Sequence, residues 1–137
     1  MRIIHTSDWH LGQNFYTKSR GPEHQAFLEW LLKAAVENDV DAIIVAGDIF
    51  DTGSPPSYAR ELYNRFVVEL QPTNCQLVVL GGNHDSVSTL NESRGLLSYL
   101  NTTVISCASS NLDQQVIMLK DRQNHPAALL CAIPFLR

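Results

Sequence analysis

Three short apolar segments, each ending in a cluster of polar residues, constrain the fold of this chain more than any other feature. They cover residues 2–6, 42–46 and 76–80. Between them, apolar residues recur at helical spacing over residues 24–38 and about 57–70, which predicts two amphipathic helices. Strands that alternate with helices are joined by right-handed crossovers, so the sequence predicts an α/β fold with a largely parallel sheet.

The rest of the chain predicts less regular structure. Residues 12–21, between the first strand and the first helix, are polar and predict a loop. Thr89 and Glu92 form a capping-box pattern, which predicts a third helix that ends near Leu100. Beyond it, short strands are expected over residues 103–106, 115–119 and 127–132, with no long helix between them.

The composition is that of one globular domain. The chain has 137 residues, of which 45% are hydrophobic and 18% are charged, and this is enough to bury a single core. Ten Lys and Arg against fourteen Asp and Glu give a net charge of −4, so no diffuse basic surface indicates a nucleic-acid partner. Cys75, Cys107 and Cys131 form no Cys-x-x-Cys pair, and no segment has the roughly 18 apolar residues of a membrane helix. We therefore expect a cytoplasmic protein with no membrane contact.

The polar clusters lie where a ligand site is expected, because the carboxyl ends of parallel strands share one edge of a sheet. The clusters bring together four carboxylates, two imidazoles and one amide, which belong to Asp8, His10, Asp48, Asp51, Asn83, His84 and Asp85. Crowded carboxylates repel one another, and bound divalent cations are the simplest compensation. Oxygen and imidazole donors favour Mn²⁺, Fe or Zn²⁺, and two such ions about 3.5–4 Å apart promote in-line displacement at phosphorus.

Each cluster taken alone has a simpler interpretation. An Asp-x-His sequence after a strand is more often a turn or a helix cap, and Gly81 and Gly82 would by themselves explain a tight turn. The occurrence of all three clusters, each at the end of a strand, favours the metal site. Asp85 is expected to shape its turn rather than to bind metal.

Three motifs identify a resemblance. Asp8-x-His10, Gly47-Asp48-x-x-Asp51 and Gly82-Asn83-His84-Asp85 resemble the first three signature motifs of the calcineurin-like metallophosphoesterases. Residues 5–12, residues 47–51 and the Pro56-Ser57 pair are similar to the branch of that family formed by DNA double-strand-break nucleases. The resemblance implies a β-sandwich flanked by helices, in four layers α/β/β/α, of which this chain would hold only the N-terminal half.

The resemblance also implies roles for single residues. Asp8 and His10 would bind a first metal ion, Asp48 would bridge two ions, and Asn83 would bind the second. The implied cofactors are two divalent cations, with Mn²⁺ preferred to Mg²⁺ or another divalent ion.

His84 would stand beside the scissile phosphate, where an imidazole stabilises charge or protonates the leaving oxygen. Asp51 is expected to orient His84 and to stabilise its protonated form. Some nuclease relatives carry His at the position of Asp51.

The family takes further histidine ligands from a downstream Gly-His and a Gly-His-x-His, and residues 1–137 contain neither pattern. Of the other histidines, His5 is expected in the core, His24 at the start of a helix and His125 in a loop. We expect residues 1–137 to be the N-terminal portion of a longer metallophosphoesterase domain, which binds metal weakly and has little or no activity alone.

The implied function is that of a metal-dependent DNA nuclease subunit, a double-strand exonuclease and single-strand or hairpin endonuclease that processes DNA ends in recombination, replication and repair. One alternative is a phosphatase or phosphodiesterase that acts on a small substrate. Another alternative, for residues 1–137 alone, is a scaffold without metal.

The implied partners are DNA, an SMC-like ATPase subunit and a second copy of the chain. The candidate contacts with the second copy are Leu62, Phe66, Leu96 and Tyr99. A polar segment after the first motif either contacts the DNA backbone or is a solvated loop. Its candidate substrate-binding residues are Asn14, Tyr16, Lys18 and Arg20.

Overall fold

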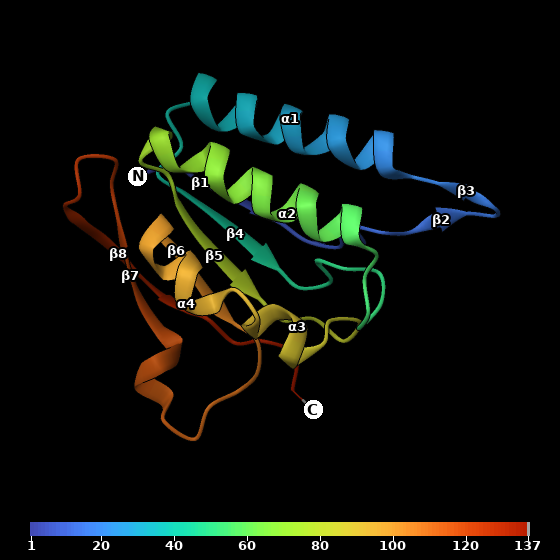
Figure 1. Ribbon diagram of the computed structural model, residues 1–137. Coiled ribbons are helices and arrows are strands. Elements are labelled where there is room, and N and C mark those ends of the chain that lie inside the picture. Colours follow the sequence, from blue (N-terminus) through green and yellow to red (C-terminus); the bar gives the residue numbers. More distant parts are fainter. Residues whose placement is uncertain (137) are drawn as a thin grey trace.

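A four-stranded parallel sheet forms the centre of the computed structural model, which describes residues 1–136 (Figure 1). The strands are β1 (Ile3–Thr6), β4 (Ala42–Ala46), β5 (Gln76–Leu80) and β6 (Thr102–Ile105), in the order β1-β4-β5-β6. Every neighbouring pair is parallel. The predicted parallel arrangement of the first three strands is therefore confirmed, and their carboxyl ends meet at one edge.

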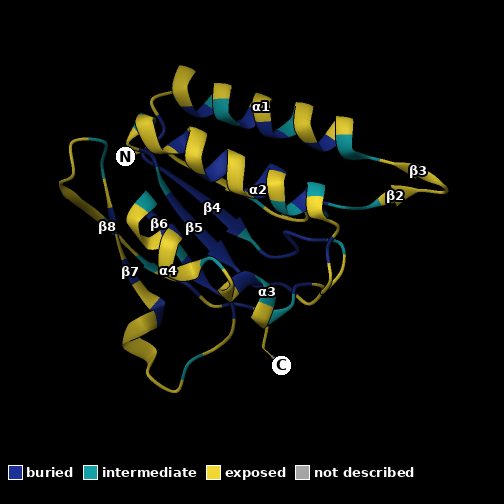
Figure 2. Cartoon of the chain, in the orientation of Figure 1, coloured by how far each residue is buried: buried dark blue, intermediate teal, exposed yellow. Residues whose placement is uncertain are grey.

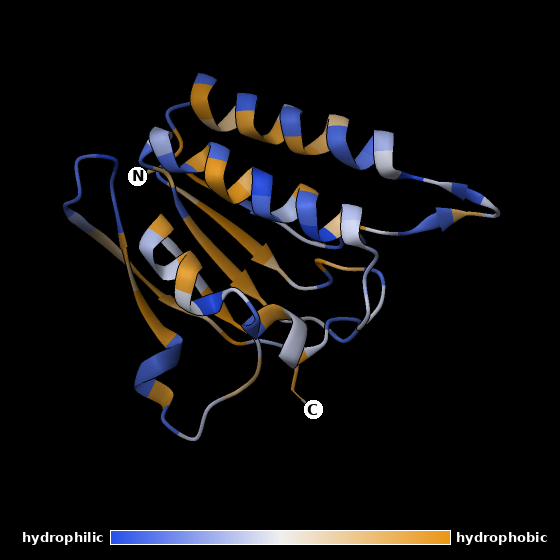
Figure 3. Cartoon of the chain, viewed as in Figure 1, coloured by the Kyte–Doolittle hydropathy of each residue, from blue (hydrophilic) through white to orange (hydrophobic). Residues whose placement is uncertain are grey.

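Two helices, α1 (Gly21–Glu37) and α2 (Ser57–Leu70), lie side by side on one face of this sheet (Figure 1). Their apolar sides face the strands and their polar sides face solvent (Figures 2 and 3). The main core lies in this layer, where Leu31, Phe66 and Val79 are at most 2% exposed. Burial of such side chains contributes roughly 1.5–3 kcal/mol each to folding.

An antiparallel pair, β7 (Val116–Lys120) and β8 (Pro126–Cys131), packs on the other face of the sheet. The second core cluster lies between this pair and the parallel sheet, and it consists of Ala42, Val78, Leu80, Ile105, Ile117, Leu119 and Ala132. The structure thus has the helix, sheet and second-sheet layers of the expected sandwich, and the second sheet contributes two strands within residues 1–136.

The predicted third helix is wrong in its start and its continuity. The chain forms α3 (Val87–Asn91), α4 (Arg94–Leu97) and the 3₁₀ turn η2 (Ser98–Leu100) in its place. The N-cap is Ser86, whose Oγ accepts a hydrogen bond from the Thr89 N–H at 3.4 Å. Thr89 is therefore inside α3 and is not its cap.

Other local differences are smaller. The predicted loop over residues 12–21 contains a short antiparallel hairpin of β2 (Asn14–Phe15) and β3 (Lys18–Ser19). Two further 3₁₀ turns are η1 (Gln71–Thr73) and η3 (Leu112–Gln115). The expectation of a core position for His5 is wrong, because its side chain is exposed on the edge strand β1. Among the helices described in residues 1–136, none combines the length and apolarity that crossing a bilayer requires.

Candidate metal centre

The loops after β1 and β4 run side by side at the carboxyl edge of the sheet. The Asp8 N–H donates to the Gly47 carbonyl at 3.1 Å, and the His10 N–H donates to the Asp48 carbonyl at 2.9 Å. These bonds continue the parallel pairing of β1 with β4 beyond the ends of the strands. The first two polar clusters are therefore fixed against each other by main-chain contacts.

A buried aromatic ring turns the polar side chains of the first loop outward. Trp9 is 4% exposed and packs edge-on against Phe27 and Phe66, at ring-centroid distances of 5.8 and 5.4 Å. Because the ring of Trp9 points into the core, its neighbours Asp8 and His10 reach the surface. In the second loop, the buried Ile49 and Phe50 lie between Asp48, which is only 9% exposed, and Asp51.

The third loop exchanges hydrogen bonds with the second. The His84 N–H donates to Asp48 Oδ1 at 3.0 Å. In return, the Asp85 carboxylate, which is only 2% exposed, accepts from the second loop and from its own loop. Its donors are the N–H groups of Ile49 at 3.2 Å, Phe50 at 3.0 Å and Gly82 at 2.8 Å. The expected role of Asp85 in shaping the turn thus extends to the neighbouring loop.

Glycine is required where the second and third loops touch. A Cβ atom on Gly82 would lie 2.1 Å from Asp48 Oδ1 and 2.3 Å from the Asp48 backbone nitrogen. Gly47, which precedes this aspartate, has a φ of +97°, a conformation that L side chains rarely adopt. These glycines let the backbone of the third loop approach the Asp48 carboxylate.

Three of the predicted ligands converge on one position. One candidate ligand atom from each of Asp8, His10 and Asp48 lies within 4.8 Å of the other two. His10 Nε2 is 3.8 Å from Asp8 Oδ1 and 3.9 Å from Asp48 Oδ2. Two carboxylates and an imidazole are a donor set that suits a divalent cation, so the described residues fit such an ion.

The same three residues have backbone conformations that are rare for side chains with a Cβ. The φ angles of Asp8, His10 and Asp48 are 56°, 46° and 52°. Residues held in sparsely populated regions cost of order 1–3 kcal/mol each, and they gather at functional sites. The hydrogen bonds between the loops hold these three residues in these conformations.

The side chain of Asp51 has a different partner from the one expected. Its Oδ1 lies 3.2 Å from His10 Nδ1, whereas His84 Nδ1 lies 3.0 Å from the main-chain oxygen of Asp51. The expectation that the carboxylate of Asp51 orients His84 is corrected in this respect, since the carbonyl makes that contact. A carboxylate on the second nitrogen of a ligating imidazole fixes the ring and makes it a better ligand.

Asn83 and His84 lie on the open side of the site, and both are exposed. Asn83 stands between Gly82 and His84, which each contact Asp48. The ring of His84 meets the ring of His10 edge-on, with centroids 5.0 Å apart. The third predicted cluster therefore adjoins the other two.

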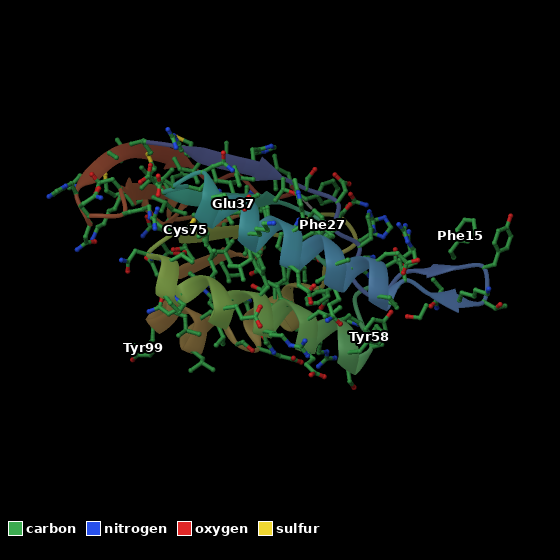
Figure 4. The ribbon with its side chains drawn as sticks, turned by 90° about the horizontal axis from the view of Figure 1, so that it is seen from above. Phe15, Phe27, Glu37, Tyr58, Cys75 and Tyr99 are labelled. Carbon is green, nitrogen blue, oxygen red and sulfur yellow. The ribbon has the colours of Figure 1, made fainter. Side chains whose placement is uncertain are left out.

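The predicted substrate-binding residues lie elsewhere, on or beside the β2–β3 hairpin. Figure 4 shows Phe15 of this hairpin at one end of the molecule, beyond the ends of the two long helices. Asn14, Tyr16 and Lys18 are exposed, whereas Arg20 is half-buried and donates to Gln13 Oε1 at 2.9 Å.

No functional role was expected for His24, which the structure buries at the start of α1. Burial, and next the charge of Arg20, lower the pKa of His24 below its ordinary value. Its Nδ1 has no hydrogen-bond partner among residues 1–136. His125 lies far along the chain, beside Asp121 in the turn between β7 and β8.

Two of the four expected dimer contacts are wrong. Leu62 and Phe66 are 8% and 2% exposed and belong to the main core, because this side of α2 faces the sheet. Leu96 and Tyr99 are 67% and 84% exposed.

The fold and the donor set define a class that comparison with known proteins also identifies. The sequence model of the calcineurin-like phosphoesterases matches residues 1–123, and the chain belongs to this family. The family implies divalent-metal binding, and the cluster of Asp8, His10 and Asp48 is the candidate site.

Similarity to particular proteins is higher still. The chain is 68% identical over 137 residues to the SbcD subunit of the SbcCD nuclease of Escherichia coli K12, with 100% of this chain and 33% of the relative covered. The SbcD protein of Rhodobacter capsulatus is 38% identical over 144 residues, with coverages of 100% and 36%. That of Bacillus subtilis is 40% identical over 91 residues, with coverages of 66% and 23%. The chain spans about a third of the length of the first two relatives.

Proposed function

We propose that this chain is the N-terminal portion of the metallophosphoesterase domain of a metal-dependent DNA nuclease subunit, in a complex of the SbcCD type. The observation that carries this proposal is the convergence of Asp8, His10 and Asp48, with His84 in ring contact with His10. The relatives are named as SbcD subunits of the SbcCD nuclease, which supports the choice of substrate and complex.

The first three ligands would hold one ion, and Asp48 with Asn83 would hold a second, with Mn²⁺ as the preferred metal. Bound ions of this kind polarise a phosphoryl oxygen and supply a nucleophile at neutral pH. Asp51 would fix His10 through Nδ1, so that Nε2 faces Asp8 and Asp48. Asp85 and Gly82 would keep the Asp48 carboxylate in place, and further donors would come from beyond residue 137.

His84 is proposed to act on the leaving oxygen. A main-chain carbonyl only accepts hydrogen bonds, so the contact with the Asp51 oxygen assigns the proton to Nδ1 of His84. Nε2 is then the atom at which a second proton is held and donated. The same carbonyl keeps the ring oriented.

The hairpin beside the metal loops is proposed to contact the DNA substrate through Asn14, Tyr16, Lys18 and Arg20. The partner would be the SMC-like ATPase subunit SbcC, and the exposed Leu96 and Tyr99 would contribute to a homodimer. A cytoplasmic location is proposed, and the free thiols of Cys75, Cys107 and Cys131 support it, because a reducing compartment maintains that state.

A cleavage assay on the full-length protein tests the proposal. We expect Mn²⁺-dependent degradation of a linear DNA duplex, lost in His84→Gln, while this variant still binds Mn²⁺ in calorimetry. Turnover of a nitrophenyl phosphate ester without action on DNA would favour the small-substrate phosphodiesterase. If the full-length protein binds Mn²⁺ and residues 1–137 alone do not, the result would favour the metal-free scaffold for residues 1–137.

A further inference from the structure

The hairpin of β2 and β3 presents two aromatic rings to solvent at its tip. Phe15 and Tyr16 are 66% and 89% exposed, and their rings meet edge-on at a centroid distance of 4.9 Å. Figures 1 and 4 show the hairpin extending past the ends of α1 and α2. These rings therefore contribute little to the core of this chain.

The conformation of the tip is unfavourable for the residue that occupies it. Phe15 pairs with Lys18, so Tyr16 and Thr17 form a two-residue turn, and Tyr16 has a φ of 54°. A positive φ at the first position of such a turn favours glycine, and a bulky residue there is an outlier. An outlier of this kind points to a function for the side chain.

The base of the hairpin is fixed to the metal loops. The Gln13 N–H donates to the His10 carbonyl at 3.0 Å, and the Arg20 N–H donates to the Gln13 carbonyl at 3.1 Å. Ser19 Oγ contacts the Tyr58 hydroxyl of α2 at 3.0 Å. Five residue steps separate His10 from Phe15, so the tip lies within about 18 Å of the metal ligand. A distance of this length is spanned by about five stacked nucleotides of a DNA strand.

The charge of the segment is opposite to that of the whole chain. No Asp or Glu occurs between Asp8 and Glu23, whereas Lys18 and Arg20 both lie there, in a chain with a net charge of −4. Single-stranded nucleic acid exposes the faces of its bases, which stack on aromatic rings, and its phosphates, which bind cations. Exposed aromatic rings beside cations, within reach of a phosphoesterase centre, therefore suit a single-stranded nucleic acid. A polypeptide partner would not need cations placed next to this centre.

We propose that Phe15 and Tyr16 form a stacking platform for an unpaired base near the DNA end that enters the metal centre, and that Lys18 binds the adjacent phosphate. The inference rests on the proposed nuclease function and adds the preference for unpaired over paired ends. The rings select the strand by its exposed base faces, and the cation adds affinity without regard to sequence.

Binding by the full-length protein tests this platform, in the His84→Gln background with Mn²⁺, so that DNA is bound and not cut. The probes are a blunt duplex and the same duplex with five unpaired nucleotides that carry 2-aminopurine. We expect Phe15→Ala with Tyr16→Ala to weaken binding of the unpaired end by roughly tenfold or more, and of the blunt end by less than about twofold. Tyr16→Phe should retain the parental affinity and the quenching of 2-aminopurine. The control Trp30→Ala removes another exposed ring, on α1, and should change neither affinity.

The outcomes separate this inference from the proposed function. Lys18→Ala should lower the salt dependence of binding by about one ion, while the aromatic variant leaves the slope unchanged. Suppose that the parental protein binds both probes. If the aromatic variant then binds both as tightly as the parent does, or loses affinity for both to the same extent, the stacking platform alone is overturned. A parental protein that binds neither probe overturns the nuclease function and the platform together.

Discussion

Replacing Asp85 with Asn tests how the second and third loops are held together. The substitution preserves the shape of the side chain and removes its charge. Asp85 is 2% exposed and accepts three main-chain N–H groups, two of them from the loop of Asp48. We expect Asp85→Asn to destabilise the protein and to weaken its binding of Mn²⁺, although Asp85 lies outside the proposed set of metal ligands.

The magnitude follows from these three hydrogen bonds. In the parent, the N–H groups of Ile49 and Gly82 both donate to Oδ2 of Asp85. In the variant, the amide oxygen can accept both of these hydrogen bonds. The amide NH₂ then faces the N–H of Phe50, which leaves a buried donor without an acceptor at a cost of about 1–3 kcal/mol. The other two hydrogen bonds no longer have a charged acceptor, so each of them contributes about 0.5–1 kcal/mol less to the stability of the fold. We expect a total of about 3 kcal/mol, or a decrease of about 10 °C in Tm for a chain of this size.

Urea unfolding measures the loss directly, provided that the slope of free energy against urea concentration is unchanged. Asp113→Asn is the matched control, because it makes the same chemical change at an exposed position on η3 and should alter stability by at most about 0.5 kcal/mol. An Asp85→Asn protein as stable as Asp113→Asn would show that the charge of Asp85 does not hold the loops together.

Three further predictions concern the surroundings of the site. Asp51→Asn should weaken Mn²⁺ binding by about 10- to 100-fold in calorimetry, because Asp51 holds His10 at Nδ1; unchanged affinity would remove Asp51 from the site. Gly82→Ala should destabilise the fold, since its Cβ would lie 2.1 Å from Asp48 Oδ1, and a crystal structure with that carboxylate unmoved would contradict this. Because burial lowers the pKa of His24 from 6.5, the unfolded chain binds the proton more readily. Stability should therefore be complete above about pH 6.5 and fall as the pH decreases further, and His24→Phe should flatten this dependence in urea unfolding between pH 7 and 5. An equally steep dependence in the variant would be contrary evidence.

The buried strands and α2 could be predicted closely from the sequence. The apolar runs of β4 and β5 leave a sheet covered on both faces as the simplest solution, and both strands have the bounds expected for them. Pro56 precedes α2, which begins at Ser57 as expected. In these segments local pattern and tertiary burial favour the same structure.

The prediction of the third helix was wrong because two residues competed for the capping position at its start. Ser86 and Thr89 are both good caps, and Ser86 makes the capping bond. The end of α3 is tied to the sheet by Ser106, whose Oγ contacts Asn91 Oδ1 at 2.9 Å. A sequence pattern contains no information about this long-range contact.

The convergence of the candidate ligands could be predicted from the sequence, but the hydrogen-bond partners of single atoms could not. The strand ends predicted that Asp8, His10 and Asp48 would meet, and they do. Whether the carboxylate of Asp51 faces His10 or His84 depends on how two loops lie across each other. Similarly, the apolar side of α2 did not reveal that the sheet, rather than a second copy, covers Phe66.

Anomalous scattering at the manganese edge, from crystals of the full-length protein grown with Mn²⁺, tests most directly whether the three loops form one metal centre. We predict a peak within about 2.0–2.5 Å of a carboxylate oxygen of Asp8, Nε2 of His10 and a carboxylate oxygen of Asp48. The absence of a peak at this position at saturating Mn²⁺, or a peak coordinated only by other residues, would contradict a shared metal centre.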